Sequence, residues 1–98
     1  MNAVSVILPS YNESASIIEA IDRISNCLGE RLLEIIVIDD NSPDGTSQIV
    51  EQHQHPKIRL ITRKNETGLA SALEMGTKLA AGEFITWLDC DLGIPPEN

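Results

Sequence analysis

The chain has 98 residues, of which 42% are hydrophobic, and it carries a formal net charge of −8. This length suits one small domain, and the negative charge argues against nucleic-acid binding, because it repels a phosphate backbone at long range. No apolar run approaches the roughly 20 residues of a membrane helix, and the N-terminal stretch lacks the basic residues of a signal peptide.

The first part of the chain is predicted to form two strands with a helix between them. Val4–Leu8 is rich in β-branched residues and is followed by a proline, which is typical of a short buried strand. Asn12 or Ser14 is expected to cap the helix. The apolar residues that follow at helical spacing are Ile17, Ile18, Ile21, Ile24 and Leu28. Leu33–Ile38 is continuously apolar, which favours a strand buried on both faces of a parallel sheet.

The second part of the chain continues the alternation of helices and strands. A turn-forming stretch, DDNSPDGT, precedes a short helix over about Thr46–Gln52. Ile58–Thr62 alternates as a half-buried or edge strand does. The next predicted helix is Leu69–Ala81, in which Gly76 allows a close approach to the sheet. Phe84–Leu88 is predicted to be the fourth strand.

This β-α-β-α-β-α-β order predicts an α/β fold with a parallel sheet and right-handed crossovers. Ligands of such sheets bind beyond the carboxyl ends of the strands. Polar clusters follow the first, second and fourth predicted strands, at residues 10–13, 39–42 and 89–91. Because three separate stretches converge on one edge, the sequence predicts a site there.

Asp89 and Asp91 are the candidate metal ligands. In an extended segment they project to the same side, and two carboxylates so placed repel each other unless a cation lies between them. Hard oxygen ligands suit Mg²⁺ or Mn²⁺. The alternative is a solvated acidic loop. Cys90, between the two acids, is a poor ligand for a hard cation and is expected to be a packing residue whose backbone touches the ligand.

Other candidates lie in the turns after the first and second strands. Tyr11 offers a ring face to a flat base, and Glu13 can accept hydrogen bonds from it, although ordinary helix capping is the alternative. Asp40 either accepts hydrogen bonds from a base or ribose, or caps a turn. Asp44 is expected to be structural.

Two basic residues, Arg63 and Lys64, follow the third predicted strand at the same edge. They can approach a phosphate, but a solvated pair is the favoured interpretation. Neither GxGxxG nor GxxxxGK[ST] is present, so the usual dinucleotide and P-loop signatures are absent.

Taken together, the segments VSVILPSYNE, EIIVIDDNSPDGT, ETGLASALEMGTKLAAGEF and LDCDLGIPPE resemble the family 2 glycosyltransferases, which have the GT-A fold. The similarity is greatest to the branch of dolichyl-phosphate mannose synthase and the polyprenyl-phosphate glycosyltransferases. The resemblance implies a parallel sheet of about four strands in the order 3-2-1-4, with helices on both faces. It also implies that residues 1–98 form the N-terminal, donor-binding part of the enzyme domain, with the acceptor half missing.

The function implied by the resemblance is metal-dependent, inverting transfer of a sugar from a UDP- or GDP-linked donor. The expected acceptor is a polyprenyl or dolichyl phosphate at a membrane surface. A saccharide acceptor in polysaccharide synthesis is one alternative, and a non-catalytic module that binds nucleoside diphosphates is another. The resemblance gives no indication of oligomeric state.

The resemblance also assigns site residues by position. Pro9, Tyr11 and Glu13 would line the base pocket, and Ile38 and Asp40 would hold the base and its surroundings. The DxD motif would reach the ribose and the metal-bound diphosphate, with its two acids binding Mg²⁺ or Mn²⁺. Its residues are Asp89, Cys90 and Asp91.

No catalytic residue is assigned within the chain. The resemblance places the general base of the reaction in the acceptor half, so it is expected beyond Asn98, the last residue of this sequence. The residues named above are therefore expected to bind the donor and the metal ion.

The chain departs from the family pattern at two positions besides the central Cys90 of the motif, where alanine is common. Asn41 stands where glycine is common, and asparagine tolerates the same left-handed backbone. Gly93 stands where the lipid-phosphate branch often has Gln, Ser or His, so no side chain there can reach metal or phosphate.

The expected location is the cytoplasm, at the cytoplasmic face of a membrane in the full-length protein. The two cysteines, Cys27 and Cys90, form no CxxC pair, and a disulfide scaffold of this length normally carries more. They are therefore expected to be reduced thiols of a cytosolic protein.

Overall fold

The computed structural model describes residues 3–64 and 68–88, and within them four parallel strands form one sheet in the order β3-β2-β1-β4. The strands are β1 (Val4–Ser10), β2 (Leu32–Asp39), β3 (Ile58–Thr62) and β4 (Phe84–Trp87). The helices are α1 (Ile17–Leu28), α2 (Thr46–His53) and α3 (Leu69–Leu79), and a 3-10 turn, η1 (Gly29–Arg31), leads into β2. The predicted α/β fold, parallel sheet and strand order are confirmed.

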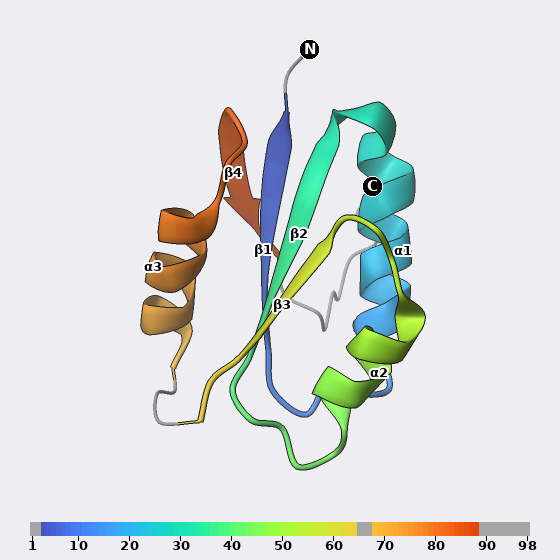
Figure 1. Cartoon of the computed structure of the whole chain (residues 1–98), viewed down its shortest axis with the longest axis vertical. Helices are drawn as coiled ribbons and strands as arrows, with labels where there is room; N and C mark the ends of the chain where they lie inside the picture. Colours follow the sequence, from blue (N-terminus) through green and yellow to red (C-terminus); the bar gives the residue numbers. More distant parts are fainter. Residues whose placement is uncertain (1–2, 65–67, 89–98) are drawn as a thin grey trace.

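Helices cover both faces of the sheet, as predicted. Figure 1 shows α1 and α2 on one face and α3 on the other. Alternate side chains of β1 serve the two cores, so that Val6 and Leu8 pack towards α1 while Ile7 packs towards α3. This two-sided burial explains why the sequences of β1 and β2 are continuously apolar.

Helix α3 lies close to β1 because residue 76 has no side chain. A Cβ atom built on Gly76 would lie 2.6 Å from Cγ2 of Ile7, which is far inside normal contact distance. The role predicted for this glycine is confirmed. The close approach brings the first turn of α3 against the carboxyl ends of the strands.

The predicted N-caps of α1 are wrong. The helix begins at Ile17, with Ser16 at the N-cap position and no side-chain capping hydrogen bond. Asn12 instead has a left-handed backbone, with φ of 55°, and its amide donates to the hydroxyl of Ser42 at 2.8 Å. The turn between β1 and α1 is thus held by tertiary contacts, which a local capping rule does not detect.

Helix α3 ends at Leu79, two residues before the predicted end, because the amide of Ala81 has a partner outside the helix. Ala80 has an extended backbone. The amide of Ala81 donates to the Glu34 carboxylate at 2.7 Å. A buried acid on β2 therefore ends this helix.

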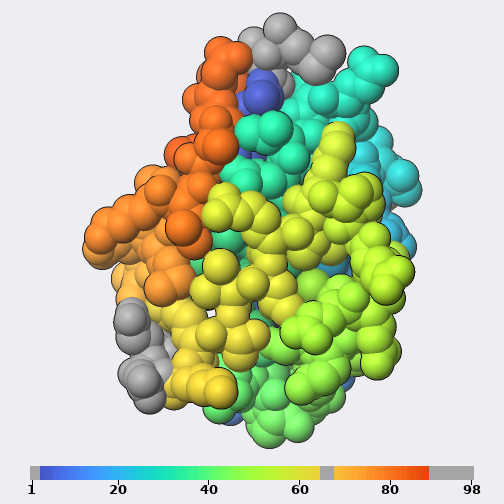
Figure 2. Space-filling view, in the orientation of Figure 1, coloured from blue at the N-terminus to red at the C-terminus, as the bar shows by residue number. Residues whose placement is uncertain are grey.

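The two sheet edges differ in how they are covered. In the space-filling view of Figure 2, β3 forms the surface between α2 and α3. At the other edge, β4 exposes Phe84, Ile85 and Trp87, each by more than 40%. Within the described residues, no helix has the length and apolar character needed to cross a membrane.

Candidate functional site

A cavity of about 530 Å³ opens at the carboxyl edge of the sheet, where the sequence predicts a site. Its walls come from the ends of β1, β2 and β4, from the segment after β3 and from the first turns of α3. The lining residues are Pro9, Ser10, Tyr11, Asp40, Asn41, Lys64, Gly68, Leu69, Ala72 and Trp87. Pro9 is accommodated in β1 because pairing with β4 ends at Ile7, so its missing N–H breaks no bond to β4.

The turn after β1 is fixed by the loop after β2. Three successive amides donate to side chains of that loop: Asn12 to Ser42, Glu13 to Thr46 and Ser14 to Asp44. These bonds hold the chain just beyond Tyr11, a residue that is 54% exposed and lines the cavity. The aromatic ring is therefore presented by an anchored loop.

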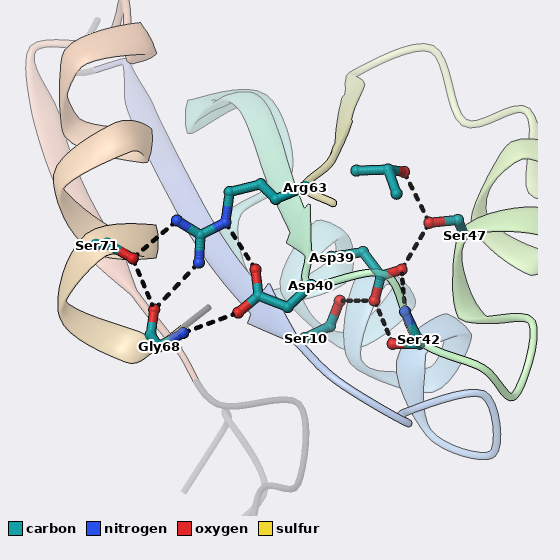
Figure 3. Close-up of polar contacts among 9 residues, drawn as sticks. Ser10, Asp39, Asp40, Ser42, Ser47, Arg63, Gly68 and Ser71 are labelled. Atoms are coloured by element: carbon teal, nitrogen blue, oxygen red, sulfur yellow. Dashed lines mark hydrogen bonds and ion pairs between the residues drawn. The ribbon is translucent and has the colours of Figure 1, made fainter. Parts of the chain in front are cut away.

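The two adjacent acids at the end of β2 have different surroundings. Asp39 is fully buried and accepts hydrogen bonds from Ser47 at 2.7 Å, from Ser10 at 3.3 Å, and from both the amide and the hydroxyl of Ser42 (Figure 3). These contacts tie the ends of β1 and β2 to the start of α2. Asp39 is thus a structural acid.

Asp40 is the acid of this pair that lines the cavity. Its Oδ1 accepts a hydrogen bond from Arg63 Nε at 2.7 Å, and its Oδ2 accepts one from the amide of Gly68 at 3.2 Å. Both donors belong to distant segments, so Asp40 does not simply cap its own turn. Next to it, Asn41 has φ of 56°, the left-handed backbone expected at that position.

The prediction of a solvated Arg63 is wrong, whereas Lys64 is exposed. The Arg63 side chain is only 3% exposed. Its Nη1 donates to Ser71 at 2.9 Å and its Nη2 donates to the carbonyl of Gly68 at 3.2 Å. The partners lie just after β2 and at the start of α3, and the sequence alone does not place these segments beside the end of β3.

Asp44 has the structural role that the sequence predicts. The hydrogen bond from the Thr46 hydroxyl holds the pKa of Asp44 down, slight burial opposes this, and the Ser14 and Thr46 amides reinforce it, so that the pKa falls to about 2. The carboxylate thereby caps the start of α2 and holds the turn before α1.

Two residues assigned to the site lie outside the cavity lining. Glu13 is half-buried at the start of α1 and accepts a hydrogen bond from the Ser16 hydroxyl at 3.1 Å. Ile38 is fully buried in the core beneath α3, together with Ile36 and Ala72. The structure therefore brings Pro9, Tyr11 and Asp40 together at the cavity, whereas Glu13 and Ile38 do not line it.

The predicted metal ligands, Asp89 and Asp91, and the intervening Cys90 lie outside the described residues. Asn98, beyond which the general base is expected, also lies outside them, so the position of that base stays a prediction. Among the residues that are described, no cluster of three or more His, Cys, Asp or Glu side chains could hold a metal ion.

Sequence reasoning missed the α3 wall of the cavity and Trp87. The available signal was positional, because the first turn of a helix that follows a parallel strand lies at the same sheet edge. The apolar residues Leu69 and Ala72 belong to the predicted helix Leu69–Ala81. In the structure they also form the cavity wall.

Comparison with known proteins gives consistent findings. Residues 5–98 match the family model "Glycosyl transferase family 2". A dolichol-phosphate mannosyltransferase of Pyrococcus furiosus is 42% identical over 96 residues, which are 96% of this chain and 27% of that protein. The mannosyltransferase PcManGT of Pyrobaculum calidifontis, solved in complex with GDP-Man and Mn²⁺, superposes with a TM-score of 0.80 at 33% identity, covering 92% of this chain and 28% of that one.

A second solved structure has the same fold with another nucleotide. Glucosyl-3-phosphoglycerate synthase of Mycobacterium tuberculosis, in complex with Mn²⁺, UDP and glucosyl-3-phosphoglycerate, has a TM-score of 0.78 at 28% identity, covering 97% of this chain and 35% of that one. The chain thus spans between a quarter and somewhat over a third of the length of these three proteins. The predicted GT-A fold is confirmed.

Proposed function

The chain belongs to glycosyl transferase family 2, and from this premise we propose that its cavity binds the nucleotide of a nucleotide-sugar donor for glycosyl transfer. One observation carries the proposal: the fold gathers Pro9, Tyr11 and Asp40 around a single cavity of about 530 Å³. This volume lies within the usual range of small-molecule sites.

The cavity offers two kinds of contact to a nucleobase. The exposed ring of Tyr11 provides a flat apolar face for stacking. The Asp40 carboxylate accepts hydrogen bonds from N–H groups at the base edge, because each of its oxygens has further lone-pair capacity beyond its present partner. In this proposal Asp40 recognises the edge of the base by hydrogen bonding, and the Tyr11 ring stacks on its face.

Asp89 and Asp91 are proposed to hold Mg²⁺ or Mn²⁺. Three described acids in and just after β2, Asp39, Asp40 and Asp44, already accept hydrogen bonds from protein donors. The two acids that follow β4 in sequence form a hard oxygen donor set that suits these ions. A cation bound there would neutralise charge on the leaving diphosphate as the sugar bond breaks.

We further propose that residues 1–98 form the donor-binding part of a longer glycosyltransferase. The chain covers 27% of the length of the Pyrococcus relative and 28% of PcManGT, which supports a further part that receives the acceptor. The general base of an inverting transfer is assigned to that part, beyond Asn98. Within this chain, the proposed task is to bind and orient the donor.

The proposed acceptor is a polyprenyl or dolichyl phosphate, at the cytoplasmic face of a membrane. The name of the Pyrococcus relative, a dolichol-phosphate mannosyltransferase at 42% identity, supports this choice. A saccharide acceptor is the alternative. Sugar transfer by the longer protein to dolichyl phosphate, compared with transfer to an oligosaccharide, separates the two. Nucleotide binding without transfer to either would identify a binding module.

Titration calorimetry with GDP and UDP, with and without Mn²⁺, tests the proposed donor site. The wild type is expected to bind one of these nucleotides in a Mn²⁺-dependent manner. Asp91→Ala should abolish the metal-dependent binding while its circular dichroism stays native. Glu51→Ala, an equal change of charge on the exposed surface of α2, is the matched control and should bind normally. Unchanged affinity in Asp91→Ala would contradict the assignment.

A further inference from the structure

Among the described residues, Arg63 is the only buried cation. Burying a guanidinium is costly unless charged and polar partners satisfy its donors. Here its Nε pairs with Asp40 at 2.7 Å, and its two terminal nitrogens reach Ser71 and the carbonyl of Gly68 at 2.9 and 3.2 Å. All three guanidinium nitrogens therefore make hydrogen bonds to residues in or next to the cavity wall.

These contacts form a closed ring of hydrogen bonds among Asp40, Arg63 and Gly68 (Figure 3). Asp40 accepts from Arg63 through one oxygen and from the amide of Gly68 through the other, and Gly68 in turn accepts from Arg63 through its carbonyl. Asp40 and Gly68 both line the cavity, whereas Arg63 does not. Arg63 thus lies behind the wall and fixes the two groups in front of it.

We propose that Arg63 is a positioning residue for nucleobase recognition. It holds the Asp40 carboxylate in the one orientation that accepts hydrogen bonds from the N–H edge of the base, and it holds the start of α3 as the opposite wall. A fork that makes three contacts fixes a carboxylate better than a single ammonium can. This inference rests on the proposed donor-binding function.

A purely structural role for Arg63 makes a different prediction. If Arg63 only fastens α3 to the sheet, its loss lowers the affinity for every ligand of the cavity by a similar factor. If it positions Asp40, its loss removes the preference for a base that carries the N–H donor. The ratio of two dissociation constants therefore distinguishes the roles, independently of overall stability.

The experiment compares each nucleotide with an analogue methylated at the ring nitrogen: UDP with N3-methyl-UDP, and GDP with N1-methyl-GDP, in Mn²⁺. In the wild type, methylation should weaken binding of the preferred nucleotide by about tenfold or more, the loss expected when a hydrogen bond to a charged group is removed. In Arg63→Met the ratio should fall towards one. Arg63→Lys keeps the charge without the fork and should give an intermediate ratio.

Arg59→Met is the matched control, because Arg59 lies on the same strand and also pairs with a β2 carboxylate, Glu34, at 3.1 Å. It should lose stability but keep the wild-type ratio. If Arg63→Met fails to fold, Arg63→Lys decides the question. A wild-type ratio in the folded Arg63 variants overturns the positioning role but leaves the proposed function standing. A wild type that binds neither nucleotide overturns both.

Discussion

The adjacent carboxylates Asp39 and Asp40 at the end of β2 have different surroundings, because successive side chains along a strand point to opposite faces of the sheet. Asp39 lies on the same side of the sheet as Val37, which faces α1 and α2, and its oxygens accept hydrogen bonds from hydroxyl groups there. Asp40 follows Ile38 on the side of α3, where the cavity opens. One step along the backbone thus separates a structural acid from one that lines the cavity.

Asp44 is expected to stabilise the fold in a pH-dependent way. Its pKa is lowered from 3.8 to about 2, so its contribution is fully present above pH 3.8 and is lost as the pH falls towards 2. Asp44→Asn should lower the urea midpoint at pH 6, and the difference from wild type should shrink at pH 3. The effect should be modest, because the carboxylate is exposed.

Glu51→Gln is the control for this measurement, since Glu51 is an exposed acid of the neighbouring helix. It should change the urea midpoint little at either pH. A difference between Asp44→Asn and wild type that stays constant from pH 6 to pH 3 would contradict the proposed linkage.

At the scale of the elements, the contact between α3 and β1 depends on Gly76. Alanine there would gain about 1 kcal/mol of helix propensity, but its Cβ would lie 2.6–2.9 Å from three carbons of the buried Ile7 side chain. We therefore expect Gly76→Ala to destabilise the fold by about 1–3 kcal/mol, the usual cost of overpacking. Equilibrium denaturation measures this change.

The double variant Ile7→Ala/Gly76→Ala checks the cause. Removing the Ile7 side chain removes all three clashing atoms, so the loss in the double variant should be smaller than the sum of the two single losses. Additive losses would show that the contact with Ile7 is not the reason.

The elements themselves could be predicted because their signals are local. The apolar runs of β1 and β2 and the helical stripe of α1 reflect burial directly. The four strands occur along the chain and in the sheet in the predicted order. The N-cap of α1 was wrong because residues 12–14 bond to side chains some 30 positions later in the chain. Pairings over that distance are set by topology and leave no local pattern.

The same limit applies to the candidate site. The position of Tyr11 and Asp40 at the carboxyl edge of the sheet could be predicted because polar residues there follow buried strands. The burial of Arg63 could not, because a basic residue after an edge strand normally reaches solvent. The placement of Asp40, Ser71 and Gly68 beside it accounts for its burial.

On the scale of the whole molecule, the two ends of the sheet differ: one holds a buried, hydrogen-bonded acid and the other holds the cavity. At the amino end, Glu34 is buried among donors from three segments: Ser5 at 2.7 Å, Ala81 at 2.7 Å and Arg59 at 3.1 Å. These bonds connect β1, β2, β3 and the link between α3 and β4. The cavity lies at the opposite, carboxyl end.

Glu34→Gln should therefore destabilise the protein without changing nucleotide affinity. In the glutamine side chain, an NH2 group replaces one of the accepting carboxylate oxygens and would face another hydrogen-bond donor. We expect the free energy of unfolding to fall by about 1–3 kcal/mol at pH 7. Burial raises the pKa of Glu34, but the Ala81, Ser5 and Arg59 hydrogen bonds outweigh it and hold the pKa below 4.5. The stabilisation is thus lost as the pH falls below 4.5.

Urea denaturation at pH 7 and at acid pH measures the change in stability, and calorimetry with the preferred nucleotide measures affinity. Ser5→Ala, which removes one of the same hydrogen bonds but leaves the acid in place, should give a smaller loss. A Glu34→Gln variant that is stable but binds nucleotide weakly would contradict this separation of the two ends.

The central position of β1 has a consequence for how the chain is made. Of the described strands β1 leaves the ribosome first, yet one of its two neighbours, β4, begins only at Phe84. Until then, one side of a very apolar segment has no strand partner, and unpaired apolar strands favour aggregation. Pairing across so long a separation also slows folding, because the loop-closure entropy of the intervening chain opposes the contact between β1 and β4.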